Sequence, residues 1–239
     1  MIPPLRAARP MLYGRRRGKA LRPGQRHLVD TRLPALSFSL PASGALDPRS
    51  LFPAPVERVW LELGFGGGEH LAAQAIAHPG IGMIGSEVYV NGVAKLLAEM
   101  ERLSIANVRL FLDDARLLVA ALAERCVARV FVLFPDPWPK ERHKKRRLVA
   151  PALLDLLARA MEDGAELRLA TDDMDYARAM LDHGLAHPAF RWCAAGPRDW
   201  RERPPDWPPT RYEQKALSAG RKPIFLRFER RAREESVRL

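Results

Sequence analysis

Cysteine is scarce in this chain: its 239 residues include Cys126, Cys193 and no third cysteine. A disulfide framework or a cysteine-based metal site needs more thiols at closer spacing, so we expect two free thiols, no metal, and a reducing compartment such as the cytoplasm. Long apolar runs are missing too, since none reaches the roughly 18 residues that a membrane-spanning helix requires. The Arg-rich and Pro-rich N-terminus has no apolar segment like that of a secretory signal. We therefore expect a cytoplasmic protein with no membrane partner.

Acidic residues are outnumbered, with 28 Asp and Glu against 39 Lys and Arg, and the formal net charge is +11. Such a balance predicts attraction to polyanions. No basic amphipathic anchor for a membrane surface stands out in the sequence. Nucleic acid is therefore the expected partner.

Residues 1–50 differ in composition from the rest of the chain. Up to Arg32 they contain nine Lys and Arg residues and one acid, Asp30, without sustained periodicity. We interpret them as a basic N-terminal extension, partly flexible, whose Tyr13 and residues 15–17 can meet phosphates. A charged tail that only aids solubility is the alternative. A folded domain is expected over residues 51–239.

From Val56 onward, short apolar runs alternate with amphipathic stretches of helix length. This alternation predicts an α/β fold, in which helices cover a parallel sheet. The expected strands are residues 58–63, 81–86, 108–112, the run ending at 134, 165–170 and 223–230. The expected helices are residues 68–78, 90–103, 117–125, 149–161 and a stretch ending near 183. Residues 192–209, which are rich in proline, are expected to form a long loop.

A glycine-rich turn is expected between the first strand and the first helix, with Gly64, Gly66 and Gly68. A dinucleotide fingerprint needs a further glycine where Glu69 stands, and a carboxylate in the first helical turn competes with a pyrophosphate for the helix dipole. The turn therefore suits a ligand without phosphates. With Glu62 it reads E-x-G-x-G-x-G, the form seen in class I methyltransferases that bind S-adenosylmethionine. An ordinary tight turn is the alternative.

Further acids follow the next strands. Glu87 follows the second strand, where Rossmann-like folds place a carboxylate for ribose hydroxyls, and Asp114 follows the third, where a carboxylate can accept from an adenine amino group. For Asp113 we favour a helix-capping role. Because parallel strands end at one rim of a sheet, these carboxylates are expected to converge on one ligand.

The fourth strand runs into a loop in which prolines alternate with Asp136, Trp138 and Lys140. Each proline fixes its own φ and favours an extended residue before it, so this loop is expected to be stiff. A stiff loop can hold a carboxylate and a flat ring against a planar substrate. The alternative is a connector whose Trp138 packs on the core.

Taken together, these motifs resemble the bacterial tRNA (guanine-N7)-methyltransferase family, whose members modify the variable-loop guanine of tRNA. The resemblance covers roughly residues 13–230, and residues 134–148 are its most specific part. The matching positions are residues 62–70, Glu87, Asp114, residues 134–148, 171–172 and 210–213, Lys215 and Gly220. The chain departs from the family pattern at Pro139 and in the proline-heavy stretch 204–209.

The resemblance implies a class I methyltransferase fold, Rossmann-like, with a mostly parallel seven-stranded sheet and helices on both faces. It implies methyl transfer from S-adenosylmethionine to N7 of guanine 46, with Asp136 as the catalytic residue. The implied cofactor site contains Glu62, Gly64, Gly66, Gly68, Glu87, Asp114 and Asp136. The implied substrate-binding residues are Lys140, Asp172, Thr210, Arg211, Tyr212 and Glu213.

Guanine N7 carries a free lone pair at neutral pH, so methylation needs no general base. We therefore expect Asp136 to orient the guanine and offset its developing charge. Trp138 either stacks on the base or packs under the loop. The basic run 140–147 is expected to meet the tRNA backbone, with some of its charges paired to local acids. Two rival hypotheses are a nicotinamide-dependent oxidoreductase and a non-catalytic RNA-binding protein, and the chain could act as a monomer or a homodimer.

Overall fold

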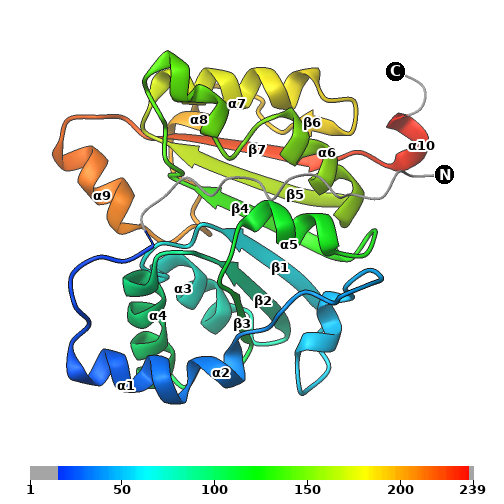
Figure 1. Cartoon of the computed structure of the whole chain (residues 1–239). Helices are drawn as coiled ribbons and strands as arrows, with labels where there is room; N and C mark the ends of the chain where they lie inside the picture. Colours follow the sequence, from blue (N-terminus) through cyan, green and yellow to red (C-terminus); the bar gives the residue numbers. More distant parts are fainter. Residues whose placement is uncertain (1–15, 237–239) are drawn as a thin grey trace.

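The computed structural model describes residues 16–236, and its backbone forms a sheet with helices on both faces (Figure 1). Tyr13 and Arg15, named above as possible phosphate contacts, lie outside these residues. The sheet order is β3-β2-β1-β4-β5-β7-β6, and β7 is antiparallel to both of its neighbours. The mostly parallel seven-stranded sheet expected from the sequence is thus confirmed. Its strands are β1 (Arg58–Leu63), β2 (Ile81–Ser86), β3 (Val108–Phe111), β4 (Val127–Leu133), β5 (Met161–Thr171), β6 (Phe190–Trp192) and β7 (Ile224–Arg230).

Two apolar cores, one on each face, hold the helices to the sheet. On one face, Leu71 of α3 (Glu69–Ala77) and Leu96 of α4 (Val90–Arg102) pack with Phe131 of β4. The other face is covered by α5 (Ala115–Ala121), α6 (Pro151–Ala160) and α7 (Met174–Ala186). Strand residues alternate between the two cores, which explains why β1 and β4 are apolar over almost their whole length.

Several element boundaries differ from the sequence-based expectation. The helix expected over residues 149–161 ends at Ala160, because Met161 already pairs with Val127 in a β5 that is longer than predicted. The expected loop 192–209 contains the short helix α8 (Arg198–Arg201), and the three-residue β6 just before it was not predicted. Elements this short leave too few residues to show a period.

Much of the expected N-terminal extension is folded against the domain. Its elements are α1 (Pro23–Thr31), α2 (Leu33–Leu36) and the 3-10 helix η1 (Pro48–Leu51), and α1 lies beside α4 (Figure 1). Leu28 is buried in the core that contains α4, Ser37 forms a β-bridge with Leu110, and Leu46 forms one with Leu122. Packing therefore continues across residue 50.

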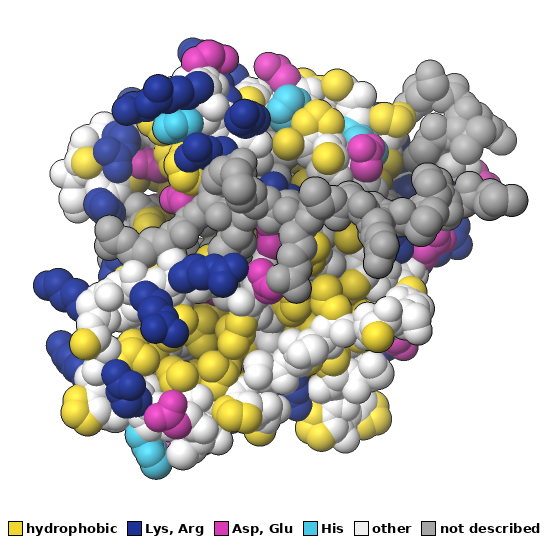
Figure 2. All heavy atoms as spheres, in the orientation of Figure 1, with side chains coloured by type: hydrophobic (Ala, Val, Ile, Leu, Met, Phe, Trp, Pro, Cys, Tyr) yellow, Lys and Arg dark blue, Asp and Glu magenta, His cyan; other side chains and the backbone are white. Residues whose placement is uncertain are grey.

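The remaining helices are α9 (Arg211–Ser218) and α10 (Arg233–Ser236). Within residues 16–236, no helix combines the length and apolar character needed to cross a membrane. Lys and Arg side chains gather over the 3-10 helix η2 (Glu141–Arg146) and along the side formed by α1 and α4 (Figure 2).

Candidate active site

A pocket of about 410 Å³ opens at the carboxyl ends of the parallel strands. Parallel α/β sheets bind ligands at this edge. The turn after β1 contributes Gly64 and Gly66, and α9 contributes Arg211 and Tyr212 from far along the chain. The acids that line it are Glu87, Asp113, Asp114 and Asp136. Three of the four acids expected to converge, Glu87, Asp114 and Asp136, therefore meet in one cavity.

The glycine turn needs glycine for two different reasons. Gly66 has a φ of 57°, and a Cβ there would lie 2.9 Å from Cε2 of the Tyr212 ring. Gly68 has a φ of 80° and is the N-cap of α3, where a Cβ would lie 2.7 Å from Cβ of Leu96. Gly66 thus allows α9 to approach the pocket wall, whereas Gly68, which does not line the pocket, allows α3 to approach α4.

The Glu87 carboxylate is fixed by three backbone N–H groups. It accepts from Gly66 N at 2.8 Å, Val88 N at 2.8 Å and Tyr89 N at 2.9 Å. Burial raises the pKa of Glu87, the backbone bonds act in the opposite direction, and the charge of Asp136 raises it further. The bond to Gly66 also ties this carboxylate to the glycine turn.

The Asp114 carboxylate is buried at 4% exposure. It caps α5 by accepting from Arg116 N at 2.9 Å, and the Arg116 guanidinium pairs with it at 2.7 Å. The capping role favoured for Asp113 is therefore wrong. Asp113 instead lines the pocket and accepts from the backbone N–H of Asp114 at 2.8 Å.

Two of the three residues that precede prolines in this loop lack the extended conformation expected there. Phe134 and Trp138 precede prolines and have φ values of 52° and 45°. This is a strained region for bulky L residues, and the two positions flank Asp136. Asp136 remains accessible to solvent as a residue, yet partial burial of its carboxyl raises its pKa. The loop is thus held by its surroundings as well as by its proline rings.

Trp138 lines the pocket and is half-buried. The Arg146 guanidinium lies over its ring, 4.9 Å from the centroid, and the His143 ring meets it edge-on at 5.8 Å. Contacts from η2 therefore orient the indole at the pocket rather than under the loop in the core.

The basic run is divided between structural and exposed charges, as expected. Lys144 and Arg147 both pair with Asp175 of α7, at 3.2 Å and 2.5 Å. Three exposed side chains form no ion pair with any acid of the described chain, and these are Lys140, Arg142 and Lys145.

The substrate-binding residues implied by the resemblance separate into two groups. Arg211 and Tyr212 line the pocket, whereas Lys140, Asp172, Thr210 and Glu213 do not. Asp172 pairs with Arg221 at 2.6 Å. Thr210 caps α9 by accepting from Glu213 N at 3.1 Å, and the Glu213 carboxylate pairs with Arg203 at 3.0 Å. These contacts shape the segment that carries Arg211 and Tyr212.

Glu62 does not line the pocket. The residue is 3% exposed, and its carboxylate lies 2.7 Å from Nδ1 of His70, which is also buried. The family resemblance implies a place for Glu62 in the cofactor site, and the sequence indicates no role for His70, because a spacing of eight residues across a turn shows no recognisable pattern.

Other pocket residues were not singled out from the sequence. Arg116 follows Asp114 by two residues and Tyr89 follows Glu87 by two, so each adjoins an assigned acid without a pattern of its own. Among the side chains described, those of residues 16–234, no group of three His, Cys, Asp or Glu is arranged to hold a metal ion.

Known proteins that are similar to this chain identify its family. A family model described as "Putative methyltransferase" matches residues 56–226. A tRNA (guanine-N(7)-)-methyltransferase from Rhodospirillum rubrum is 58% identical over 224 residues, which cover 92% of this chain and 88% of the relative. A protein with the same name from Paramagnetospirillum magneticum is 50% identical, with 95% of each chain covered.

Among solved structures, the 16S rRNA (adenine(1408)-N(1))-methyltransferase from Catenulisporales acidiphilia aligns with a TM-score of 0.51 at 17% identity. The alignment covers 74% of this chain and 89% of that one, and it supports the fold alone. The sequence relatives carry the assignment further: this chain belongs to the tRNA (guanine-N(7)-)-methyltransferase family.

Proposed function

We propose that the protein transfers a methyl group from S-adenosylmethionine to N7 of guanine 46 in the variable loop of tRNA, forming 7-methylguanosine. The observation that carries this proposal is the meeting of Glu87 and Asp136 in a pocket walled by the glycine turn, with exposed basic residues beside it. The names of the curated relatives support the same reaction. The catalytic domain of this proposal spans residues 51–239, with residues 1–50 as a basic extension.

The pocket fits S-adenosylmethionine in size and charge. Small-molecule sites occupy roughly 300–1,000 Å³. The acids Glu87 and Asp136 suit a cationic ligand, and Glu69 in the first turn of α3 disfavours a phosphate there. Glu87 would accept from the ribose hydroxyls, Asp114 would accept from the adenine amino group beside Arg116, and Gly64 and Gly66 would let the ligand approach the backbone. When bound, the cofactor supplies a methyl group on a positively charged sulfur.

Asp136 orients the guanine and does not act as a general base. Its carboxylate can accept from the N1–H and N2–H groups of the base and offset the positive charge that forms on the purine. N7 already has its lone pair, so no residue has to abstract a proton there. The strained backbone on either side of Asp136 supports a preorganised position for this carboxylate.

The remaining residues bind and orient the RNA. Trp138 stacks on the splayed-out guanine, and the Arg146 guanidinium, which lies over its ring, holds the indole in position. Arg211 and Tyr212 contact the base or its ribose from α9. Asp172 would reach the substrate only by exchanging its partner Arg221. The exposed Lys140, Arg142 and Lys145 bind the phosphate backbone of the tRNA. The protein acts in the cytoplasm.

Incubation of an unmodified tRNA transcript with the protein and S-adenosylmethionine tests the proposal. Nucleoside mass spectrometry should find 7-methylguanosine, and a transcript with adenine in place of guanine 46 should give none. Methyl groups found only on carbon or on an exocyclic nitrogen would refute transfer to N7. Product from the adenine-46 transcript would refute the position.

A further inference from the structure

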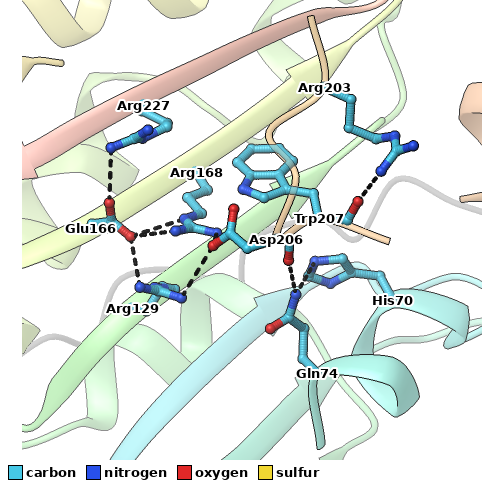
Figure 3. Close-up of polar contacts among 9 residues, drawn as sticks. All are labelled: His70, Gln74, Arg129, Glu166, Arg168, Arg203, Asp206, Trp207 and Arg227. Atoms are coloured by element: carbon cyan, nitrogen blue, oxygen red, sulfur yellow. Dashed lines mark hydrogen bonds and ion pairs between the residues drawn. The ribbon is translucent and has the colours of Figure 1, made fainter. Parts of the chain in front are cut away.

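A buried chain of hydrogen bonds leads from Glu62 away from the pocket. Glu62 meets Nδ1 of His70 at 2.7 Å. Nε2 of His70 lies 3.4 Å from Nε2 of Gln74, and Gln74 donates to the Asp206 carbonyl at 2.9 Å (Figure 3). Glu62, His70 and Gln74 are each at most 3% exposed. These hydrogen bonds join the end of β1 to a segment more than 130 residues away in sequence.

The direction of each hydrogen bond in this series follows from the group at one end, the Asp206 carbonyl. The Asp206 carbonyl can only accept, so the Gln74 amide turns its NH₂ group toward it, and that same group faces Nε2 of His70. His70 therefore accepts at Nε2 and carries its proton on Nδ1, where it donates to Glu62. The Glu62 carboxylate is thus engaged in a hydrogen bond within the protein interior.

The segment at the far end is anchored firmly. Arg168, itself 4% exposed, donates to the Asp206 carboxylate at 2.7 Å and lies over the Trp207 ring, 5.4 Å from its centroid (Figure 3). Trp207 is 2% exposed and packs edge-on against Phe131 and Phe225, with centroids 6.4 Å and 5.7 Å away. Asp206 and Trp207 therefore hold this part of the polypeptide against the sheet.

This anchor leads directly back to the pocket. Arg203 donates to the Trp207 carbonyl and pairs with Glu213, in the first turn of α9. The neighbour of Glu213 is Tyr212, whose ring covers Gly66 in the glycine turn. Residues 203–213, here called the anchored segment, thus connect the buried chain to the pocket wall.

We propose that Glu62 and Gln74 are positioning residues that hold the anchored segment, and through it Tyr212, against the glycine turn. In this role Glu62 acts through His70 and does not bind the cofactor directly, unlike the role that the family resemblance implies for it. The inference rests on the proposed function for what Tyr212 contacts. The hydrogen bonds that carry it are independent of that function.

Hydrogen exchange of the ligand-free full chain tests the positioning role. Glu62→Ala and Gln74→Leu should speed exchange of backbone amides in residues 203–213 about tenfold, since each cuts the buried chain. Glu62→Gln should stay within about twofold, because its amide oxygen still accepts from Nδ1 of His70. Glu99→Ala on the exposed side of α4 is the control and should leave the segment unchanged. Unaltered exchange in Gln74→Leu would overturn the proposal, and if Glu62→Ala does not fold, Gln74→Leu and Glu62→Gln decide.

Calorimetry with S-adenosylmethionine tests the second half of the claim. Glu62→Gln should bind within about threefold of the unmutated chain, whereas neutralising a carboxylate that contacts the cation would weaken binding tenfold or more. A tenfold loss in Glu62→Gln would therefore refute the indirect role. Gln74→Leu should raise KM for tRNA about tenfold with kcat changed less than threefold, because Tyr212, which the anchored segment holds in place, contacts the guanine or its ribose in the proposed function. No binding by the unmutated chain would refute the proposed function while leaving the exchange result valid.

Discussion

Arg147 donates from Nε to the carbonyl oxygen of Pro137 at 2.7 Å. This bond ties the end of the basic run to the loop that carries Asp136. Arg147 also pairs with Asp175 and lies over the Tyr176 ring, 4.7 Å from its centroid, and it is only 7% exposed. One residue of a run that reads as an RNA contact is therefore part of the loop's support.

Replacing Arg147 by alanine should release the loop. A displacement of about 1 Å at a reacting group can lower the rate by about 100-fold, so we expect kcat to fall by one to two orders of magnitude. Loss of the buried hydrogen bonds should also reduce the free energy of unfolding by about 1–3 kcal/mol. Single-turnover methylation and urea unfolding measure the two effects.

Lys144→Ala is the matched control, because Lys144 shares Asp175 with Arg147 and forms no bond to Pro137. It should leave kcat within about threefold. Equal losses in the two variants would mean that charge near α7, rather than support of the loop, determines the rate.

Alanine substitutions of Asp136 and Glu87 should affect turnover and cofactor affinity differently. Asp136→Ala removes the group that orients the guanine, so turnover should disappear while affinity for S-adenosylmethionine falls modestly. Glu87→Ala removes a carboxylate held by three backbone N–H groups and should weaken cofactor binding by tenfold or more. Calorimetry and single-turnover assays on both variants separate the roles. Continued turnover by Asp136→Ala, with equal losses of affinity, would contradict them.

The sequence predicted the sheet well because its core strands are short, continuous apolar runs separated by helix-length stretches. It also located three of the pocket acids, since the topology of parallel strands brings their ends together. It missed what depends on distant partners. The His70 contact of Glu62 and the positive φ values of Phe134 and Trp138 arise from packing that no local pattern records. For the same reason, Leu28 in the basic extension did not stand out as a core residue.

Cofactor affinity should depend on pH through Glu87. Burial raises the pKa of this carboxyl above the usual range of glutamate. The ionised form accepts from the ribose hydroxyls, so affinity should fall as pH decreases through the raised value, earlier than for an exposed glutamate. In the free protein, the stabilising effect of Glu87 is present below the ordinary pKa of glutamate and is lost as pH rises through the raised pKa.

Calorimetry between pH 8 and pH 5 measures this dependence. The ratio of affinities of the unmutated chain and Glu87→Gln isolates the residue from the ionisation of the cofactor itself. Glu101→Gln, an exposed substitution on α4, should leave the profile unchanged. A ratio that stays constant across the range would contradict titration of Glu87 between pH 5 and pH 8.

Binding of tRNA should weaken steeply with salt, and the slope should report the exposed cations of the basic run. Each phosphate contact contributes about 0.7–0.9 to the slope of log affinity against log salt. Removing Lys140, Arg142 and Lys145 together should therefore reduce the slope by about two to three, since none of them pairs with an acid within residues 16–234. Arg191→Ala, which breaks a pair with Glu229 on the sheet, should change it by less than about 0.5. Filter binding from 50 to 300 mM salt checks both, and equal slopes for the triple variant and the unmutated chain would place the RNA path elsewhere on the surface.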